Sequence, residues 1–171
     1  APTEIRIPFK APTMRDIVRL VVVPSHDASK EEPADASLYA IDSLRKADQR
    51  LGMSDFRGHF LLAKDGQLIP GRSLELNGNC WPGKNDGAIQ IVLAGNGKSP
   101  TEAQRRTLYD FGVAMRRHYE KPLQASVRDV VFAEGILGID PNGRMQEPLA
   151  NASLVTADPA AKAAKNAART V

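Results

Sequence analysis

Few residues in this sequence have side chains that could act as nucleophiles or metal ligands. The triplet Ser25-His26-Asp27 contains the residue types of a serine hydrolase triad. Consecutive residues cannot stack as nucleophile, base and orienting acid, so the triplet does not predict a triad. The three histidines, His26, His59 and His118, have no ligand spacing. We interpret His59 as a residue at a strand edge and His118 as a polar residue in the last turn of a helix, where the dipole favours it.

Cys80 is the only cysteine of the chain, which excludes an intramolecular disulfide and a thiolate zinc cluster. A thiol nucleophile would need an activating base, and the sequence does not place one nearby. We therefore expect Cys80 to be a small buried residue. It lies in residues 73–84, a segment rich in Asn and Gly, and loops of this composition commonly line sites.

A β-hairpin is the clearest element that would position these residues. Residues 60–63 suit a buried strand, and residues 67–69 suit an antiparallel return strand. Between them, Asp65-Gly66 supplies the positive φ that a two-residue hairpin turn requires. The sequence therefore predicts a hairpin closed by these two residues.

Two further apolar runs predict strands buried on both faces. Residues 17–23 are nearly all apolar and mostly β-branched, so we place this strand at the centre of the sheet. Residues 88–94 predict a second buried strand, and residues 123–131 are a third candidate. Such continuous apolar runs are typical of a sheet that is covered on both sides.

Two helices are predicted to cover this sheet. Residues 34–51 carry apolar side chains at spacings of three and four, and Gly52 ends the pattern. The second helix begins at the sequence Ser99-Pro100-Thr101-Glu102, with Ser99 as N-cap, Pro100 at the first helical position and Glu102 closing a capping box.

The sequence divides into one α/β domain and two arms. Residues 17–145 form the domain, a mixed sheet flanked by helices. Residues 1–16 are rich in proline and predict an extended arm, in which Ile5, Ile7 and Phe9 alternate and would lie on another surface. Residues 146–171 form a tail rich in Ala and Lys near its end.

Composition limits the classes of function. The chain has 171 residues, of which 42% are hydrophobic and 25% charged, as in a globular protein with one core. A net charge of +3 is too small a bias to require a nucleic-acid partner. No run approaches the roughly 18 apolar residues of a membrane span.

The hairpin and the order of the other motifs resemble a known family. The pattern Phe-Leu-Leu-x-Lys-Asp-Gly in the hairpin resembles the central hairpin of type 2 N-acetylmuramoyl-L-alanine amidases, which peptidoglycan recognition proteins and phage amidase lysozymes share. Segments similar to the other motifs of this family occur in the same order as in the family, at residues 20–29 before the hairpin and at residues 85–96, 126–130 and 139–143 after it. The resemblance implies the amidase fold.

The resemblance also implies where a zinc site would lie. Active members hold zinc with two His and one Asp or Cys, and the open position carries the water that attacks the amide. The matching positions here are Ser25, Val127 and Asp140, so only the aspartate matches a ligand. Gly58 stands where the family has a catalytic Tyr. We therefore expect no catalytic residues and no bound zinc. The alternative is a relocated zinc site made of His26, Cys80 and Asp140.

These observations favour a protein with the amidase fold that does not hydrolyse peptidoglycan. Our first hypothesis is a structural or binding component, such as part of a phage virion, with the arms holding protein partners in an assembly or homo-oligomer. One alternative is a zinc-dependent amidase with relocated ligands. Another is a module that binds peptidoglycan without cleaving it. The corresponding locations would be a virion or the bacterial cell envelope.

Overall fold

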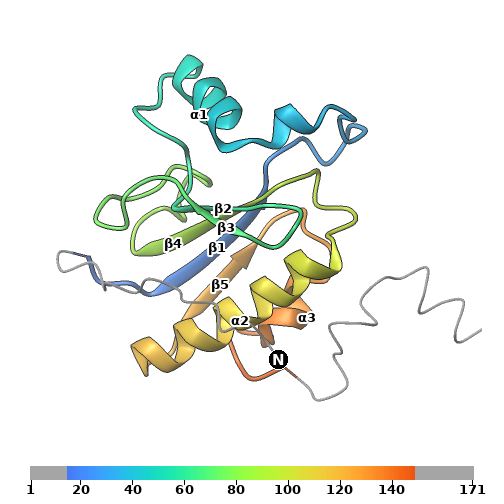
Figure 1. Ribbon diagram of the computed structural model, residues 1–171. Helices are drawn as coiled ribbons and strands as arrows, with labels where there is room; N and C mark the ends of the chain where they lie inside the picture. The colour runs from blue at the N-terminus through green and yellow to red at the C-terminus, as the bar shows by residue number, and fades with distance from the viewer. Residues whose placement is uncertain (1–14, 149–171) are drawn as a thin grey trace, which may run out of the picture.

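The computed structural model describes residues 15–148, which form a five-stranded sheet with helices on both faces (Figure 1). The strand order is β3-β2-β4-β1-β5. β2 and β3 pair antiparallel, whereas β4 pairs parallel with β2 and with β1, and β1 pairs parallel with β5. The strands are β1 (Arg19–Pro24), β2 (Phe60–Leu62), β3 (Leu68–Pro70), β4 (Ala88–Leu93) and β5 (Gln124–Val127). The mixed sheet is confirmed, but β4 rather than β1 takes its central position.

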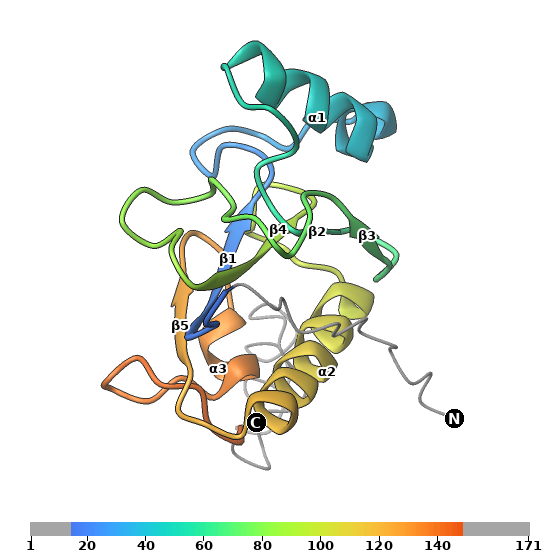
Figure 2. The same cartoon turned by 90° about the vertical axis from the view of Figure 1, so that its left-hand side faces the viewer.

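Helices cover the sheet unequally. α2 (Glu102–Tyr119) and α3 (Ala133–Leu137) lie on one face, and α1 (Ile41–Arg50), preceded by the 3-10 helix η1 (Ala36–Tyr39), lies on the other (Figures 1 and 2). The prediction of one helix over residues 34–51 is wrong. Ala40 adopts an extended conformation with ψ 143° and separates η1 from α1, although the apolar spacing continues across the break.

The core consists of two apolar layers, one on each face of the sheet. Alternate residues of β1 contribute to each, with Leu20 and Val22 facing α2 and α3, and Val21 and Val23 facing the other way. The α2 side is completed by Leu108, Phe111 and Met115, all at most 1% exposed. The other layer holds Phe56, Leu61, Cys80 and Val92, with Ile41 and Leu44 of α1 only partly buried against it. Burial on both faces explains the continuous apolar runs of the sequence.

The predicted hairpin is confirmed as β2 and β3, but its turn is longer than two residues. The Ala63 N–H donates to Gln67 O at 2.9 Å, and the Gly66 N–H donates to Ala63 O at 2.8 Å. Gly66 has φ +88°, while Asp65 is not among the residues of positive φ. A turn of Lys64, Asp65 and Gly66 with glycine in the left-handed position is the common three-residue hairpin loop.

The N-terminal cap of α2 also differs from the prediction. Thr101 is the N-cap, and its hydroxyl accepts the Gln104 N–H at 3.1 Å, while Gln104 Oε1 accepts the Thr101 N–H at 3.0 Å. Gln104 Nε2 donates to Leu62 O and Ala94 O, which lie at or just beyond the ends of β2 and β4. Because Gln104 satisfies two strand ends as well as the helix, this capping box prevails over the one predicted from Ser99 and Glu102.

Residues just outside the predicted domain, residues 17–145, contact it at both ends. Arg15, which the sequence assigns to the arm, donates to Leu74 O and Ala88 O at 2.5 Å and to Leu76 O at 2.9 Å. At the other end, Glu147 pairs with Arg116. The apolar arm residues Ile5, Ile7 and Phe9 lie outside the described residues. Within residues 15–148, no helix combines the length and apolar character needed to span a membrane.

Candidate functional site

The connections of the sheet define one location for a ligand site. The chain leaves β1 through α1 toward β2 on one side, and it leaves β4 through α2 toward β5 on the other side. These paths diverge between the carboxyl ends of β1 and β4. In open α/β sheets, ligands bind at such a switch point. The residues that follow the two strands are Ser25 and His26 after β1, and Gly95 and Asn96 after β4.

Ser25 lies directly at the switch point. Its N–H donates to Leu93 O at 2.8 Å, which continues the pairing of β1 with β4. The Gly95 N–H donates to Ser25 Oγ at 2.9 Å, and the same oxygen lies 2.7 Å from His26 Nδ1. The first predicted zinc-site position therefore holds a hydroxyl group that connects both strands to a histidine.

A network of polar side chains surrounds Ser25, and we call it the switch-point cluster. Glu32 accepts hydrogen bonds from Lys64 Nζ and, at 3.2 Å, from the Asn96 N–H. Lys64 Nζ also lies 4.1 Å from the centre of the Tyr39 ring, which in turn lies 4.8 Å from the ring of His26. The members of the switch-point cluster are Ser25, His26, Glu32, Tyr39, Lys64 and Asn96.

The environment of this cluster changes the pKa values of two of its members. Desolvation lowers the pKa of His26 below its ordinary value, with Glu32 opposing and Lys64 adding to the effect. For Glu32, burial acts to raise the pKa, but the hydrogen bonds from Lys64 and the Asn96 N–H outweigh it and lower the pKa overall. The cluster thus favours a neutral imidazole of His26 and a charged carboxylate of Glu32.

The other two predicted zinc-site positions lie elsewhere. Val127 packs on the α2 side of the sheet, in register with Val22. Asp140 accepts the N–H groups of Asn142 and Arg144 in a turn, and Arg144 bridges to Gln124 at the start of β5. Because β1 and β5 are parallel, this turn lies at the opposite end of the sheet from Ser25. The structure does not bring the three positions together.

The alternative zinc set is not assembled either. Cys80 is 4% exposed, its thiol donates to Arg57 O at 3.5 Å, and burial raises its pKa to about 12. Among residues 15–148, no three His, Cys, Asp or Glu side chains are grouped as a metal site. His26, Cys80 and Asp140 therefore do not form one, and Cys80 is buried as expected.

His59 and Gly58 have structural roles. His59 accepts the Gln90 N–H at Nδ1 and its Nε2 lies 2.7 Å from Leu76 O, so both ring nitrogens are occupied. Desolvation lowers the pKa of His59 to about 4. At Gly58 an added Cβ would lie 2.9 Å from Val92 Cγ2, so the position of the family's catalytic Tyr leaves no space for a side chain.

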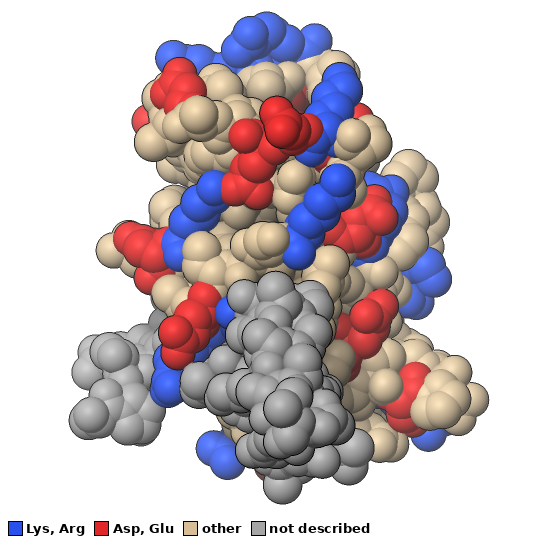
Figure 3. All heavy atoms as spheres, turned by 90° about the vertical axis from the view of Figure 1, so that its right-hand side faces the viewer, with Lys and Arg blue, Asp and Glu red and all other residues tan. Residues whose placement is uncertain are grey.

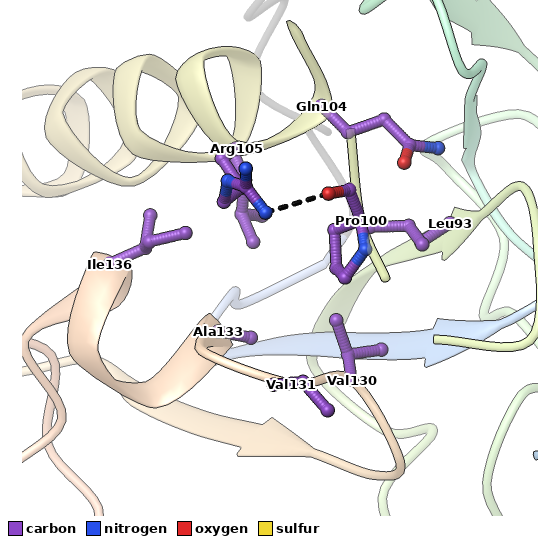
Figure 4. A pocket seen from close by; sticks show the side chains of 9 residues that line it. Leu93, Pro100, Gln104, Arg105, Val130, Val131, Ala133 and Ile136 are labelled. Atoms are coloured by element: carbon purple, nitrogen blue, oxygen red, sulfur yellow. Dashed lines mark hydrogen bonds between the residues drawn. The ribbon is translucent and has the colours of Figure 1, made fainter. Parts of the chain in front are cut away.

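Two hollows lie near the carboxyl ends of the strands. The first is an apolar crevice between α2, α3 and β4, which Arg105 borders while donating to Pro100 O at 2.7 Å (Figure 4). It has about 0 Å³ of space for a water-sized sphere, so it does not admit a ligand. The second is an open depression of about 580 Å³, lined by Asp27, Ala28, Ser29, Lys98, residues 129–131 and Glu134.

The depression begins one residue beyond His26 and carries charges of both signs. Its size is within the range of small-molecule sites. On the face shown in Figure 3, acidic and basic side chains are likewise interspersed, so no single-sign patch of the kind that attracts nucleic acid is visible there.

Ser25 and His26 were recognisable as candidate site residues from the sequence, but Glu32, Lys64 and Tyr39 were not. These residues belong to the connection after β1 and to the hairpin turn, and only the folded chain brings them together. The Lys-Asp-Gly sequence of the hairpin was visible, but nothing in it indicates a glutamate partner 32 residues away.

Comparison with solved structures shows the fold of N-acetylmuramoyl-L-alanine amidases and peptidoglycan recognition proteins, as the motifs predicted. The amidase LysC from Clostridium intestinale URNW is 20% identical, with a TM-score of 0.55 over 67% of this chain and 71% of that one. Drosophila peptidoglycan recognition protein SA is 20% identical, with a TM-score of 0.54 over 66% and 68%.

A third similar structure contains a ligand. The complex of peptidoglycan recognition proteins LCa and LCx with bound tracheal cytotoxin includes a chain that is 19% identical, with a TM-score of 0.50 over 66% of this chain and 70% of that one. No protein-family model and no curated protein sequence matches this chain. The similarity of this chain to the solved structures is therefore a similarity of fold.

Proposed function

We propose that this protein binds peptidoglycan without zinc-dependent hydrolysis of the muramoyl amide. The observation that carries the proposal is the amidase and peptidoglycan recognition fold combined with a switch point at which Ser25 replaces the first ligand. The solved complex with tracheal cytotoxin supports ligand binding on this fold.

The groups at the three predicted zinc-site positions do not suit a catalytic zinc ion. A catalytic zinc needs three protein ligands and an open position for water. The Ser25 hydroxyl is already bound to Gly95 and His26, Val127 has no donor atom, and Asp140 is bound to its own turn. The switch-point cluster instead offers hydrogen-bonding and charged groups that suit a polar glycopeptide.

Binding to insoluble peptidoglycan sacculi tests this function with the full chain. We expect the protein to sediment with sacculi and to release no soluble peptide, with or without a chelator. His26→Gln should weaken sedimentation because His26 belongs to the switch-point cluster. His118→Gln is the matched control, since α2 runs back from the switch point and His118 lies in its last turn.

Two results would overturn the proposal. If the protein stays in the supernatant at every sacculus concentration, the fold is used for something else. If peptide is released and a chelator abolishes the release, the chain is a zinc amidase with relocated ligands.

A further inference from the structure

The contacts of Ser25 match those of an activated nucleophile. Its Oγ lies 2.7 Å from His26 Nδ1, within the distance at which a general base takes up a hydroxyl proton. The second contact to a possible acceptor, Gly95 O, is longer at 3.3 Å. In the tautomer that carries its proton on Nε2, Nδ1 accepts the hydroxyl proton of Ser25.

We propose that Ser25 is a nucleophile that accepts an acyl group from a small ester, with His26 as its general base. The sequence triplet suggested a triad with Asp27, but Asp27 accepts hydrogen bonds from the Ser29 N–H and hydroxyl and takes no part. The site is a dyad of Ser25 and His26 at the switch point, where α/β enzymes commonly place their reactive groups.

Neighbouring groups fix the position of the nucleophile and set the charge of the base. The Gly95 N–H donates to Ser25 Oγ at 2.9 Å and so holds this oxygen in place. Desolvation lowers the pKa of His26, with Glu32 opposing this effect and Lys64 adding to it, so the imidazole is held in the neutral form that accepts the hydroxyl proton.

The reaction follows from these contacts. Ser25 Oγ forms a bond to the carbonyl carbon of the ester while its proton moves to His26 Nδ1. The bond from carbon to the alcohol oxygen then breaks, and Nδ1 returns the proton to the departing alkoxide. Water repeats the sequence on the acyl-serine, which gives a carboxylic acid and free Ser25. Atoms and charges balance in these steps without a metal ion or a redox partner.

We assign the alcohol part of the ester to the open depression, whose lining begins with the residue that follows the dyad in the chain. It starts at Asp27, it holds about 580 Å³, and its walls include Asp129 and Glu134 beside the apolar Val130 and Val131. Carboxylates on such walls accept hydrogen bonds from hydroxyl groups. The substrate class that fits is therefore an acyl ester of a hydroxyl-rich alcohol, such as an O-acylated sugar.

A fluorophosphonate probe tests the nucleophile directly, because it forms a bond from phosphorus to an activated serine oxygen and releases fluoride. We expect labelling of the Ser25 peptide in the full-length protein, with none in Ser25→Ala. His26→Gln should slow labelling by roughly a hundredfold, the contribution of a general base. Ser37→Ala is the matched control, because Ser37 donates to Asp35 rather than to an imidazole.

Labelling spread over several serines, or labelling of Ser25 that does not change in His26→Gln, would overturn the proposal. Near-ultraviolet circular dichroism of each variant establishes that the fold is retained. A chelator should leave the labelling rate unchanged. Sacculus binding is measured separately, so a failure of the nucleophile and a failure of peptidoglycan binding give different results.

Discussion

At the scale of single residues, buried polar side chains fix the positions of neighbouring segments. Asp48 is 2% exposed, and its carboxylate accepts the Arg57 N–H at 2.8 Å and the Arg57 guanidinium at 2.6 Å. His59 joins β4 to the loop at Leu76 in the same way. Such residues are recognised in the sequence only as polar positions, because their partners are distant in the chain.

Asp48→Asn should destabilise the domain by about 3 kcal/mol, because the change leaves the Arg57 guanidinium without its buried partner. Asp42→Asn on the same helix removes a contact to Arg45 in which the aspartate side chain is 80% exposed. This control should cost at most about 1 kcal/mol. Urea unfolding of both variants measures the difference, and equal losses would contradict the structural role of the buried pair.

Gly66→Val should destabilise the domain more than Gly83→Val. Both glycines have positive φ, +88° and +84°, and a β-branched residue is strained there by about 1 to 2 kcal/mol. At Gly66 the added Cβ would also lie 2.9 Å from Ala103 O, whereas nothing lies within 4 Å at Gly83. The contact with α2 should add about 1 kcal/mol or more to the loss. Melting temperatures that fall equally would mean that the hairpin loop is not held against α2.

At the scale of secondary-structure elements, the spacing of apolar residues predicted the features that depend on neighbours in the chain. The strands β1 and β4 followed from apolar runs, and the apolar face of α2 followed from helical spacing. The break at Ala40 and the choice of Thr101 as N-cap did not, and for the cap the reason is a tertiary contact. Thr101 Oγ1 donates to Lys64 O in the hairpin loop, a contact that the sequence around Ser99 does not reveal.

Thr101→Ala should destabilise the domain by about 1 kcal/mol, because it removes the acceptor for the Gln104 N–H and the contact to Lys64. Ser99→Ala tests the cap that the sequence alone predicted, and it should change the stability by less than about 0.5 kcal/mol. Thermal unfolding followed by circular dichroism separates the two variants. A larger loss of stability in Ser99→Ala than in Thr101→Ala would mean that Ser99 is the N-cap.

At the scale of the whole molecule, the order of motifs along the chain predicted the amidase and peptidoglycan recognition fold. The same motifs grouped Ser25, Val127 and Asp140 as zinc-site positions, which the structure does not bring together. Sequence similarity alone does not show which face or end of a sheet a residue occupies. The assembly role of Ile5, Ile7 and Phe9 stays a prediction. Deletion of residues 1–14 should leave the domain folded and impair assembly.

We expect the purified protein to contain no stoichiometric zinc after mild dialysis, because Ser25 and Val127 replace two nitrogen ligands. Elemental analysis of the untagged full chain measures the metal content. About one zinc per chain would contradict this expectation, and loss of that zinc in His26→Gln would locate it at the switch point.

The contacts that attach α1 to the rest of the domain determine how easily this helix opens. Asp48 is the one residue of this helix that is buried, and Ile41 and Leu44 are only partly buried against the sheet, so α1 has fewer buried contacts than α2. A segment with so few buried apolar contacts opens at a lower free energy than the core. Amide hydrogens of α1 should therefore exchange with solvent well before those of β1 and β4, as one cooperative unit. α1 would then move away from the sheet as one unit when a large polymer binds on that face.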